Sequence, residues 1–279
     1  PMTAPSYDIV VIGAGPAGLS AASEAAKAGL KTYCLDKLAP GGVLINLGDL
    51  HDFEDGVDGP TLSSRLADEA MAAGVEVGFG EVAAITGGGP WIVSTAEGEQ
   101  HTARAVIVAT GLNKGRLGVP NEEAYEGRGL STCATCDGPL YAGKPVIVAG
   151  VGGWADVEAR ELEAMAGQVT IMDPARQRIV GLEGNDGLEA VVVETDSARK
   201  SVPASAVFVY VNETPAAEFL PDLLARDATG HIVVDAEGRT SSPTVFAVGD
   251  VRGGARRKLS EAIADGRRAG KAVATALKK

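Results

Sequence analysis

The beginning of the chain alternates apolar runs with small-residue segments, which predicts a strand–turn–helix–strand unit. Residues 7–12 form a short run rich in β-branched side chains, typical of a strand buried on both faces of a parallel sheet. A glycine-rich turn follows at once, and an alanine-rich stretch to about Ala28 predicts a helix that Gly29 ends. A second apolar run, 31–35, then ends at Asp36.

This pattern returns once later in the chain. Residues 145–149 predict a second buried strand, a second glycine-rich turn begins at Gly150, and a helix to about Met165 leads to a strand at 168–172. We also expect helices at 62–73 and about 259–277, and strands at 75–77, 103–109, 188–194, 206–211, 231–235 and 243–248. The repeat predicts an α/β fold of two Rossmann-like three-layer domains.

The length of 279 residues suits two domains of ordinary size. We expect the first domain to be discontinuous, formed by 1–112 and 240–279. The second domain, 113–239, is then inserted into the first and abbreviated. The last helix carries apolar residues partly on one face, with alanines between them: Leu259, Ile263, Val273 and Leu277.

The formal net charge of −12 changes the expected partners more than the expected fold. Such an acidic surface repels nucleic acid and anionic membranes, so we expect neither as a partner. No apolar run approaches membrane-spanning length, and no N-terminal stretch has the pattern of a signal peptide. A cytoplasmic location is the expectation.

Two of the three cysteines, Cys133 and Cys136, form a C-x-x-C spacing. A structural zinc ion would need two further ligands, and none of the histidines, His51, His101 and His231, lies beside the pair in sequence, so we expect no metal. In a reducing cytosol such a pair indicates a redox couple.

The first glycine-rich turn has the spacing of a dinucleotide-binding loop. Gly13 permits the tight turn, Gly15 lets the backbone approach a pyrophosphate, and Gly18 lets the helix pack close to the strand. The helix N-terminus attracts the anion, and Asp36 would accept hydrogen bonds from a ribose.

Several motifs resemble the low-molecular-weight thioredoxin reductases over nearly the whole chain. The first glycine-rich unit is similar to their FAD fingerprint, residues 41–44 (G-G-V-L) to their flavin-side G-G-Q-L, and residues 109–111 to their A-T-G turn. Residues 133–138 (C-A-T-C-D-G) match their redox motif letter for letter, and residues 240–251 resemble their second FAD motif.

The resemblance implies non-covalent FAD as the cofactor and a homodimer as the assembly. The residues that it implies as FAD contacts are Gly13, Gly15, Pro16, Ala17, Gly18, Asp36, Gly42, Val43, Leu44, Val82, Thr110, Gly111, Gly249, Asp250, Arg257 and Lys258. It further implies that Cys136 exchanges electrons with the flavin and that Cys133 meets the substrate. Asp137 would be the general acid or base beside the pair, although an acid there can also simply serve the start of a helix.

The second glycine-rich unit departs from the family. The basic cluster that holds the NADPH 2′-phosphate in the family is replaced here by Asp173-Pro174-Ala175. Trp154 falls beside the expected pyrophosphate seat, and only about 35 residues separate Met172 from the next family-like strand at Val207, which suggests that a helix and a strand are missing. These departures make NADPH doubtful as a substrate of this chain.

Two milder differences concern the flavin. Val43 replaces the flavin-facing glutamine, and Asp52 falls where many relatives have asparagine. The basic run at 252–258 is consistent with an anionic reduced flavin, with an acidic electron-transfer partner, or with a solvated loop.

The resulting hypothesis is a thioredoxin-reductase-like FAD enzyme that acts on a disulfide or dithiol substrate, independently of NADPH. The substrate is a thioredoxin-like protein or a small molecule, and electrons are exchanged with another donor, such as a protein, or with oxygen. A conventional NADPH-dependent thioredoxin reductase and a non-catalytic, flavin-bound redox sensor are the alternatives.

Overall fold

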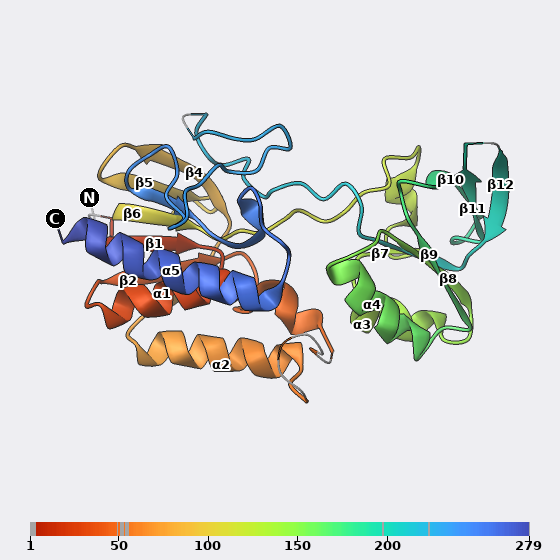
Figure 1. Ribbon diagram of the computed structural model, residues 1–279, viewed down its shortest axis with the longest axis horizontal. Helices are drawn as coiled ribbons and strands as arrows, with labels where there is room; N and C mark the ends of the chain where they lie inside the picture. Colours follow the sequence, from red (N-terminus) through yellow and green to blue (C-terminus); the bar gives the residue numbers. More distant parts are fainter. Residues whose placement is uncertain are drawn as a thin grey trace. The chain divides into compact units, whose positions relative to one another are not determined.

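A computed structural model of the chain describes residues 4–48, 50, 53, 56–196, 198–222 and 224–278. The chain divides into two compact units, one formed by Pro1–Leu112 and Pro215–Lys279 and the other by Asn113–Thr214 (Figure 1). We call them the first and the second unit. Within the described part of the chain, none of the helices combines the length and apolar character needed to cross a membrane.

The first unit is built on one seven-stranded sheet. Its strand order is β3 (Glu76–Phe79), β2 (Thr32–Asp36), β1 (Ser6–Ile12), β6 (Gln100–Val108), β5 (Trp91–Thr95) and β4 (Val82–Gly87), and β14 (Val245–Ala247) also pairs with β6. The five strands β3, β2, β1, β6 and β14 are parallel, whereas β4 and β5 form an antiparallel extension. The carboxyl ends of β1, β2, β6 and β14 therefore lie along one edge of the sheet, where the loops that follow them come together.

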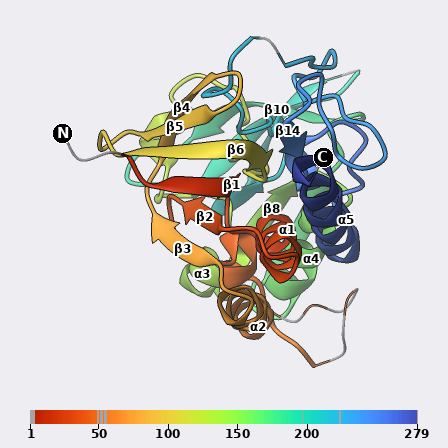
Figure 2. The same ribbon diagram turned by 90° about the vertical axis from the view of Figure 1, so that its left-hand side faces the viewer.

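Helices cover one face of this sheet (Figure 2). α1 (Pro16–Lys27) packs closely against α5 (Leu259–Leu277), and α2 (Gly59–Ala72) packs on α1. The approach of α1 to α5 is so close that a Cβ at Gly266 would lie 2.0 Å from the carbonyl oxygen of Ala17. The sequence pattern predicted α1 and α5 because both helices present small and apolar residues on the buried side.

The boundary of the inserted domain differs from the sequence expectation. Residues 215–239 belong to the first unit, where Ala217, Leu220 and Ile232 join the core on the face of the sheet opposite to the helices. At the expected strand 231–235, Ile232 forms isolated bridges to Arg226 and to Arg252, and the segment is not part of a sheet. Packing of scattered apolar residues, which has no strand or helix period, decides the fold of this segment.

The second unit has three layers of its own. Its parallel sheet has the order β7 (Leu130–Ser131), β13 (Ala206–Val209), β8 (Pro145–Ala149) and β9 (Gln168–Met172). One face packs against α3 (Ala134–Asp137) and α4 (Trp154–Glu163). The other face packs against an antiparallel meander of β10 (Arg178–Glu183), β11 (Ala190–Glu194) and β12 (Arg199–Pro203). This meander, without any helix among its described residues, makes the connection from β9 to β13.

The chain passes from one unit to the other at two points, after Leu112 and after Thr214, and in each unit the residues at these two points are paired. Within the second unit, the backbone N–H of Asn113 donates to the carbonyl oxygen of Thr214 at 2.7 Å. Within the first unit, Leu112 and Pro215 form an isolated antiparallel bridge. In both units, the two positions where the insertion begins and ends are therefore held together by backbone pairing.

A buried histidine on β6 predicts how the stability of the first unit responds to acid. His101 packs against Tyr33, with the ring centroids 4.6 Å apart, and both of its ring nitrogens lack a hydrogen-bond partner within the described residues. Burial lowers the pKa of His101, and the Glu99 carboxylate, 3.8 Å from its Nε2, offsets only part of that effect. The unfolded chain therefore takes up a proton at a higher pH than the folded chain does.

We expect the free energy of unfolding to fall as the pH is lowered from about 6.5 to the depressed pKa of His101. The loss amounts to about 1.4 kcal/mol per unit of difference between the unfolded and folded pKa values. Below the folded pKa, His101 contributes no further loss. His101→Phe, which keeps an aromatic ring in the cluster, should flatten this part of the profile. Urea denaturation between pH 8 and pH 4 measures it, with His231→Gln as the control for loss of an imidazole. An unchanged profile in His101→Phe would show that His101 is not responsible.

Candidate functional site

The first glycine-rich loop joins β1 to α1 at the carboxyl edge of the first unit's sheet. Gly13 has a φ of +103°, and a Cβ there would lie 2.4 Å from the carbonyl oxygen of Ala109. A Cβ at Gly18 would lie 1.8 Å from the carbonyl oxygen of Gly13. Both positions therefore require glycine for close packing, which brings the N-terminus of α1 against the ends of β1 and β6.

Gly15 serves a different purpose from its neighbours. A Cβ at Gly15 would meet no heavy atom within 4 Å, so the position is open on the side where α1 begins. Protein packing therefore does not require glycine at position 15. The glycine instead leaves free space beside the backbone. An anion can approach the backbone N–H groups at the start of this 12-residue helix through that opening.

Asp36 ends β2 beside the same loop. Its Oδ2 accepts a hydrogen bond from the backbone N–H of Ala14 at 2.6 Å, and its Oδ1 accepts one from Leu38 at 2.8 Å. These two bonds fix the carboxylate next to the glycine-rich turn. The carboxylate is partly exposed, so its remaining lone pairs can accept hydrogen bonds from a ribose.

The loop after β2 approaches the first loop directly. Gly41 donates its N–H to the carbonyl oxygen of Ala14 at 2.7 Å, and a Cβ at Gly42 would lie 3.1 Å from the Cα of Gly15. Val43 in η1 (Gly42–Asn46) is 55% exposed, whereas the side chain of Leu44 is fully buried. Of the two apolar candidates, Val43 is the one that presents its side chain to an incoming group.

The remaining candidates divide into two groups. Gly249 lies against α1, since a Cβ there would be 3.0 Å from that of Ala17. Asp250, Arg257 and Lys258 line the same small hollow as Gly249, at the start of α5. Thr110 donates its hydroxyl to the carbonyl oxygen of Ala216 at 2.6 Å, a contact that holds the chain's return to the first unit beside Gly111.

One candidate is not joined to this group by the structure. Val82 lies at the start of β4 and packs against the core cluster on the other face of the sheet. An FAD contact at Val82 stays a prediction. Asp52, which falls where many relatives have asparagine, lies outside the described residues.

The structure shows a supporting residue that sequence reasoning missed. Asp265, almost fully buried in α5, accepts a hydrogen bond from the backbone N–H of Gly249 at 2.9 Å and forms ion pairs with Arg252 and Arg268. It thereby fixes the loop that carries Gly249 and Asp250. The available signal was an aspartate between the apolar Ile263 and the small residues of the buried side of α5.

The residues gathered at this edge fit FAD. An open backbone cradle at Gly15 and a helix N-terminus suit a pyrophosphate, and an acid at the end of β2 suits a ribose. The exposed Val43 and the hollow lined by Asp250 and Lys258 are further parts of this edge. Among the described residues, no group of three or more His, Cys, Asp or Glu side chains is placed to hold a metal ion.

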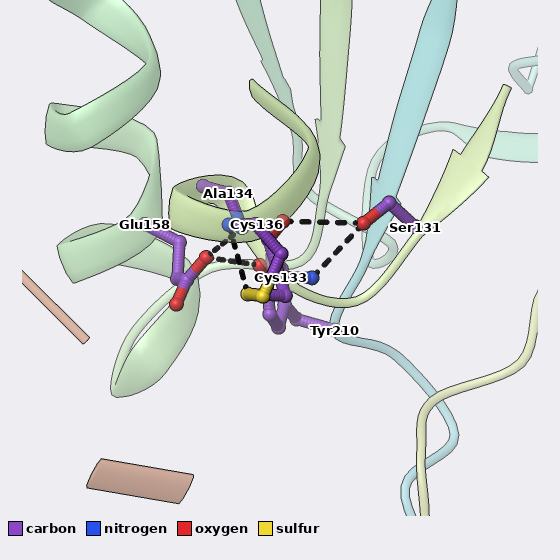
Figure 3. The surroundings of a disulfide bond; sticks show 6 residues. All are labelled: Ser131, Cys133, Ala134, Cys136, Glu158 and Tyr210. Carbon is purple, nitrogen blue, oxygen red and sulfur yellow. Dashed lines mark hydrogen bonds between the residues drawn. A yellow bond between two sulfur atoms is a disulfide. The ribbon is translucent and has the colours of Figure 1, made fainter. Parts of the chain in front are cut away.

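The Cys133–Cys136 pair lies in the second unit (Figure 3). Cys133 and Cys136 are joined by a disulfide with their Cα atoms 5.4 Å apart. Cys133 is the residue before α3, and its Sγ accepts a hydrogen bond from the N–H of Cys136 at 3.1 Å. Ser131 accepts from the N–H of Cys133 at 3.1 Å and donates to its carbonyl oxygen at 3.3 Å, so the backbone before the pair is held on both sides.

The two cysteines differ in exposure and in their surroundings. Cys136 is exposed and Cys133 is partly buried. Asp137 follows Cys136 directly and is partly exposed. Burial raises the pKa of the nearby Tyr141, and the negative charge of Asp137 raises it further, so Asp137 lies close enough to Tyr141 to interact with it.

Sequence reasoning missed a second carboxylate beside the pair. Glu158 on α4 is 3% exposed and accepts hydrogen bonds from the backbone N–H of Ala134 and from the hydroxyl of Tyr210. The signal was its position: Glu158 shares the buried face of α4 with Ala155, Ala159 and Leu162. An acid within an otherwise apolar helix face requires specific partners.

One backbone donor of the second glycine-rich turn is bound by a side chain of the protein itself. The backbone N–H of Gly152 donates to Oδ1 of Asp156 at 2.9 Å, so a carboxylate of α4 binds a donor that faces the start of its own helix. Trp154 is the first residue of α4 and is partly exposed. The turn after β9 is closed in a similar way, because Oδ1 of Asp173 accepts from the N–H of Ala175 at 3.0 Å.

The basic residues after β9 are paired with acids. Nε of Arg176 lies 3.7 Å from Oδ2 of Asp173. Arg178 and Arg199 both contact Glu194, at 2.8 Å and 2.6 Å. The positive charges that follow the second strand of this unit are therefore partly neutralised within the unit.

Comparison with known proteins gives one consistent result. A family model described as pyridine nucleotide-disulphide oxidoreductase matches residues 7–180 and 175–269. A thioredoxin reductase from Listeria monocytogenes serovar 1/2a is 34% identical over 293 aligned residues, which cover 95% of this chain and 92% of that protein.

Solved structures agree with the sequence matches. The crystal structure of T. acidophilum thioredoxin reductase is similar with a TM-score of 0.89 and 30% identity, covering 97% of this chain and 98% of that one. A ferredoxin-flavin thioredoxin reductase from Clostridium acetobutylicum is similar with a TM-score of 0.57 and 25% identity, covering 99% and 98% of the two chains.

Proposed function

This chain belongs to the pyridine nucleotide-disulphide oxidoreductase family, as an FAD-dependent oxidoreductase that acts on disulfides, and we propose that it works without NADPH. The observation that carries the proposal is the hydrogen bond from Gly152 to Asp156. A nucleotide pyrophosphate binds such a loop through backbone N–H groups, and here a carboxylate already accepts from one of them.

Charge adds to this obstruction. A pyrophosphate at the second glycine-rich turn would meet the negative charge of Asp156, and a 2′-phosphate would meet that of Asp173. Between exposed charges at close range, each repulsion amounts to about 1 kcal/mol in water and to about 4 kcal/mol at an effective dielectric of 20. Two such terms weaken binding by roughly thirtyfold to several hundred thousandfold. Arg176 and Arg178, the nearest cations in sequence, already contact acids.

Cys133 is the residue that would attack a substrate disulfide. A thiolate is the nucleophile in such exchange, and in the disulfide form Sγ of Cys133 already accepts the N–H of Cys136. Attack forms a mixed disulfide between Cys133 and one substrate sulfur, while the other substrate sulfur leaves as a thiolate and takes up a proton. Cys136 then attacks Sγ of Cys133, which releases the second substrate thiol and re-forms the Cys133–Cys136 disulfide.

Asp137 is the proposed proton donor and acceptor for these steps, since it directly follows Cys136 and is accessible. FAD, when bound, supplies the two electrons that return the pair to dithiols, or takes them up when the enzyme oxidises a dithiol. The exposed Cys136 is the member of the pair proposed to exchange electrons with it.

The electron donor or acceptor is proposed to be a protein or oxygen instead of a pyridine nucleotide. A solved structure similar to this chain is a ferredoxin-flavin thioredoxin reductase, which supports a protein donor. A dithiol oxidase that passes electrons to oxygen fits the same site. Assembly as a homodimer and a cytoplasmic location also stay predictions.

The test is anaerobic mixing of the FAD-loaded protein with NADPH, with NADH and with a small dithiol, followed by flavin absorbance. We expect the dithiol to reduce the flavin, which shows that the cofactor and the pair are competent. NADPH and NADH should reduce it at least a hundredfold more slowly, because neither can displace Asp156 without a loss of binding free energy.

Fast reduction by NADPH would contradict the proposal and establish the conventional reductase. Fast reduction by NADH alone would mean that the second glycine-rich turn is open and that only the 2′-phosphate is rejected by Asp173. Failure of the dithiol as well, with no turnover of any disulfide by chemically reduced protein, would favour the redox sensor.

A further inference from the structure

Glu158 is placed at the redox pair without belonging to the sequence motif that defines it. Its Oε2 accepts the N–H of Ala134, the residue that directly follows Cys133 (Figure 3). Ala134 is fully buried, so this backbone donor has no access to water and depends on the carboxylate. The contact therefore anchors the first residue of α3 to α4.

The second partner of Glu158 comes from another part of the fold. The hydroxyl of Tyr210, which follows β13, donates to the same Oε2 at 2.8 Å. Ala134, Glu158 and Tyr210 thus form a chain of hydrogen bonds with the carboxyl in the middle (Figure 3). Both donors point to one oxygen, an arrangement that favours the ionised carboxyl.

Burial works against that ionised form. It raises the pKa of Glu158, whereas the hydrogen bonds from Ala134 and Tyr210 lower it and the charge of Glu161 raises it further. Burial also raises the pKa of Tyr210, to which the charges of Glu158 and Glu213 contribute, so Tyr210 stays a donor. The segment that contains Ala134 also carries the two cysteines and Asp137, and Tyr141 at the end of η3 (Gly138–Tyr141) interacts with Asp137.

We propose that Glu158 is a positioning residue that fixes the Cys133–Cys136 segment and, as a buried negative charge beside it, opposes thiolate formation at Cys133. The Glu158 carboxylate binds the N–H of the peptide bond between Cys133 and Ala134, so a Cys133 thiolate in the reduced protein would be a second negative charge next to this bond. Neighbouring like charges disfavour each other's ionised forms, so one proton is shared between them. Reduction of the disulfide is then coupled to proton uptake at Glu158.

The inference rests on the proposed role of the pair as a dithiol–disulfide couple, but it does not depend on whether NADPH is used. Glu158→Gln is the informative variant, because its amide oxygen still accepts from Ala134 while the negative charge is gone. We expect the pKa of the more reactive thiol to fall by about one unit. At a pH above the thiol pKa, the equilibrium with a dithiol buffer should shift up to about tenfold toward the reduced protein, which corresponds to about 30 mV.

Two further variants make the experiment specific. Glu163→Gln removes the same charge from an exposed position on α4 and should leave both values unchanged. Tyr210→Phe deprives Glu158 of one donor, which makes the carboxyl easier to protonate, and should shift the thiol in the same direction as Glu158→Gln but by less. This variant also tests the inference if Glu158→Gln does not fold.

The measurements are the pH dependence of thiol alkylation in the reduced protein and equilibration with a dithiol–disulfide buffer. A purely structural role for Glu158 would change stability but move neither the alkylation profile nor the equilibrium. Values for Glu158→Gln and Tyr210→Phe equal to those of Glu163→Gln, or a rise in the thiol pKa, would overturn the inference. A pair that does not equilibrate with dithiols even in the unaltered protein would instead refute the proposed function.

Discussion

Cys133→Ser is expected to reduce dithiol or disulfide turnover by at least about a thousandfold, because a hydroxyl cannot form the disulfide that the reaction requires. The fold should persist, since the hydroxyl can still accept the N–H of Cys136 that Sγ accepts now. Cys136→Ser should abolish turnover equally, because the mixed disulfide at Cys133 then has no resolving thiol. Turnover of a small dithiol and of a thioredoxin-like disulfide measures both effects.

Cys34 provides the matched control for loss of one sulfur. It is fully buried in β2, and burial raises the pKa of its thiol, so it is inert at neutral pH. Cys34→Ala should therefore retain turnover. Substantial activity in either Cys133→Ser or Cys136→Ser would remove the pair from the mechanism.

Gly18→Ala is expected to destabilise the first unit by about 3 kcal/mol or more and to abolish FAD binding. The added Cβ would lie 1.8 Å from the carbonyl oxygen of Gly13, so α1 has to move away from the end of β1. Urea denaturation and the flavin released per mole of protein on heating measure the two effects. The released flavin of the unaltered protein should be FAD and not FMN, because the loop is shaped for a pyrophosphate.

Gly15→Ala separates the fold from the cofactor. Its Cβ meets no heavy atom within 4 Å, so the fold should keep its stability while FAD binds at least tenfold more weakly. Gly88→Ala, which also adds a Cβ in open space but lies far from the loop in sequence, should change neither property. Stoichiometric FAD at full stability in Gly18→Ala would contradict the close packing described for α1.

The fold was predictable wherever a segment has its own period. β1, α1, β2, β8, α4 and α5 lie where apolar runs or helical spacing place them, because each buries one continuous surface. The antiparallel pair β4 and β5 was missed, since these strands are short and the turn between them is a run of glycines. Residues 215–239 were assigned to the wrong unit because tertiary packing alone holds them.

The site divides along the same line. Residues whose type is dictated by backbone geometry, such as Gly13 and Gly18, can be found from spacing alone, and the structure brings them together. The sequence could not assign hydrogen-bond partners to Glu158, Asp156 and Asp265. All three accept from backbone N–H groups, which have no sequence signature, and the bonds of Glu158 and Asp265 also join segments that only the fold brings side by side. The shortened connection from β9 to β13 was anticipated from its length, but not that a meander would make it.

The closed ends of the two units have an evolutionary consequence. Asn113 pairs with Thr214 and Leu112 bridges to Pro215. The inserted segment therefore begins and ends at neighbouring positions. Residues can be gained or lost within the inserted segment without altering the path of the chain in the first unit. A nucleotide site in such a segment can therefore decay while the flavin site is inherited intact, and a lineage can change its source of electrons without rebuilding its cofactor.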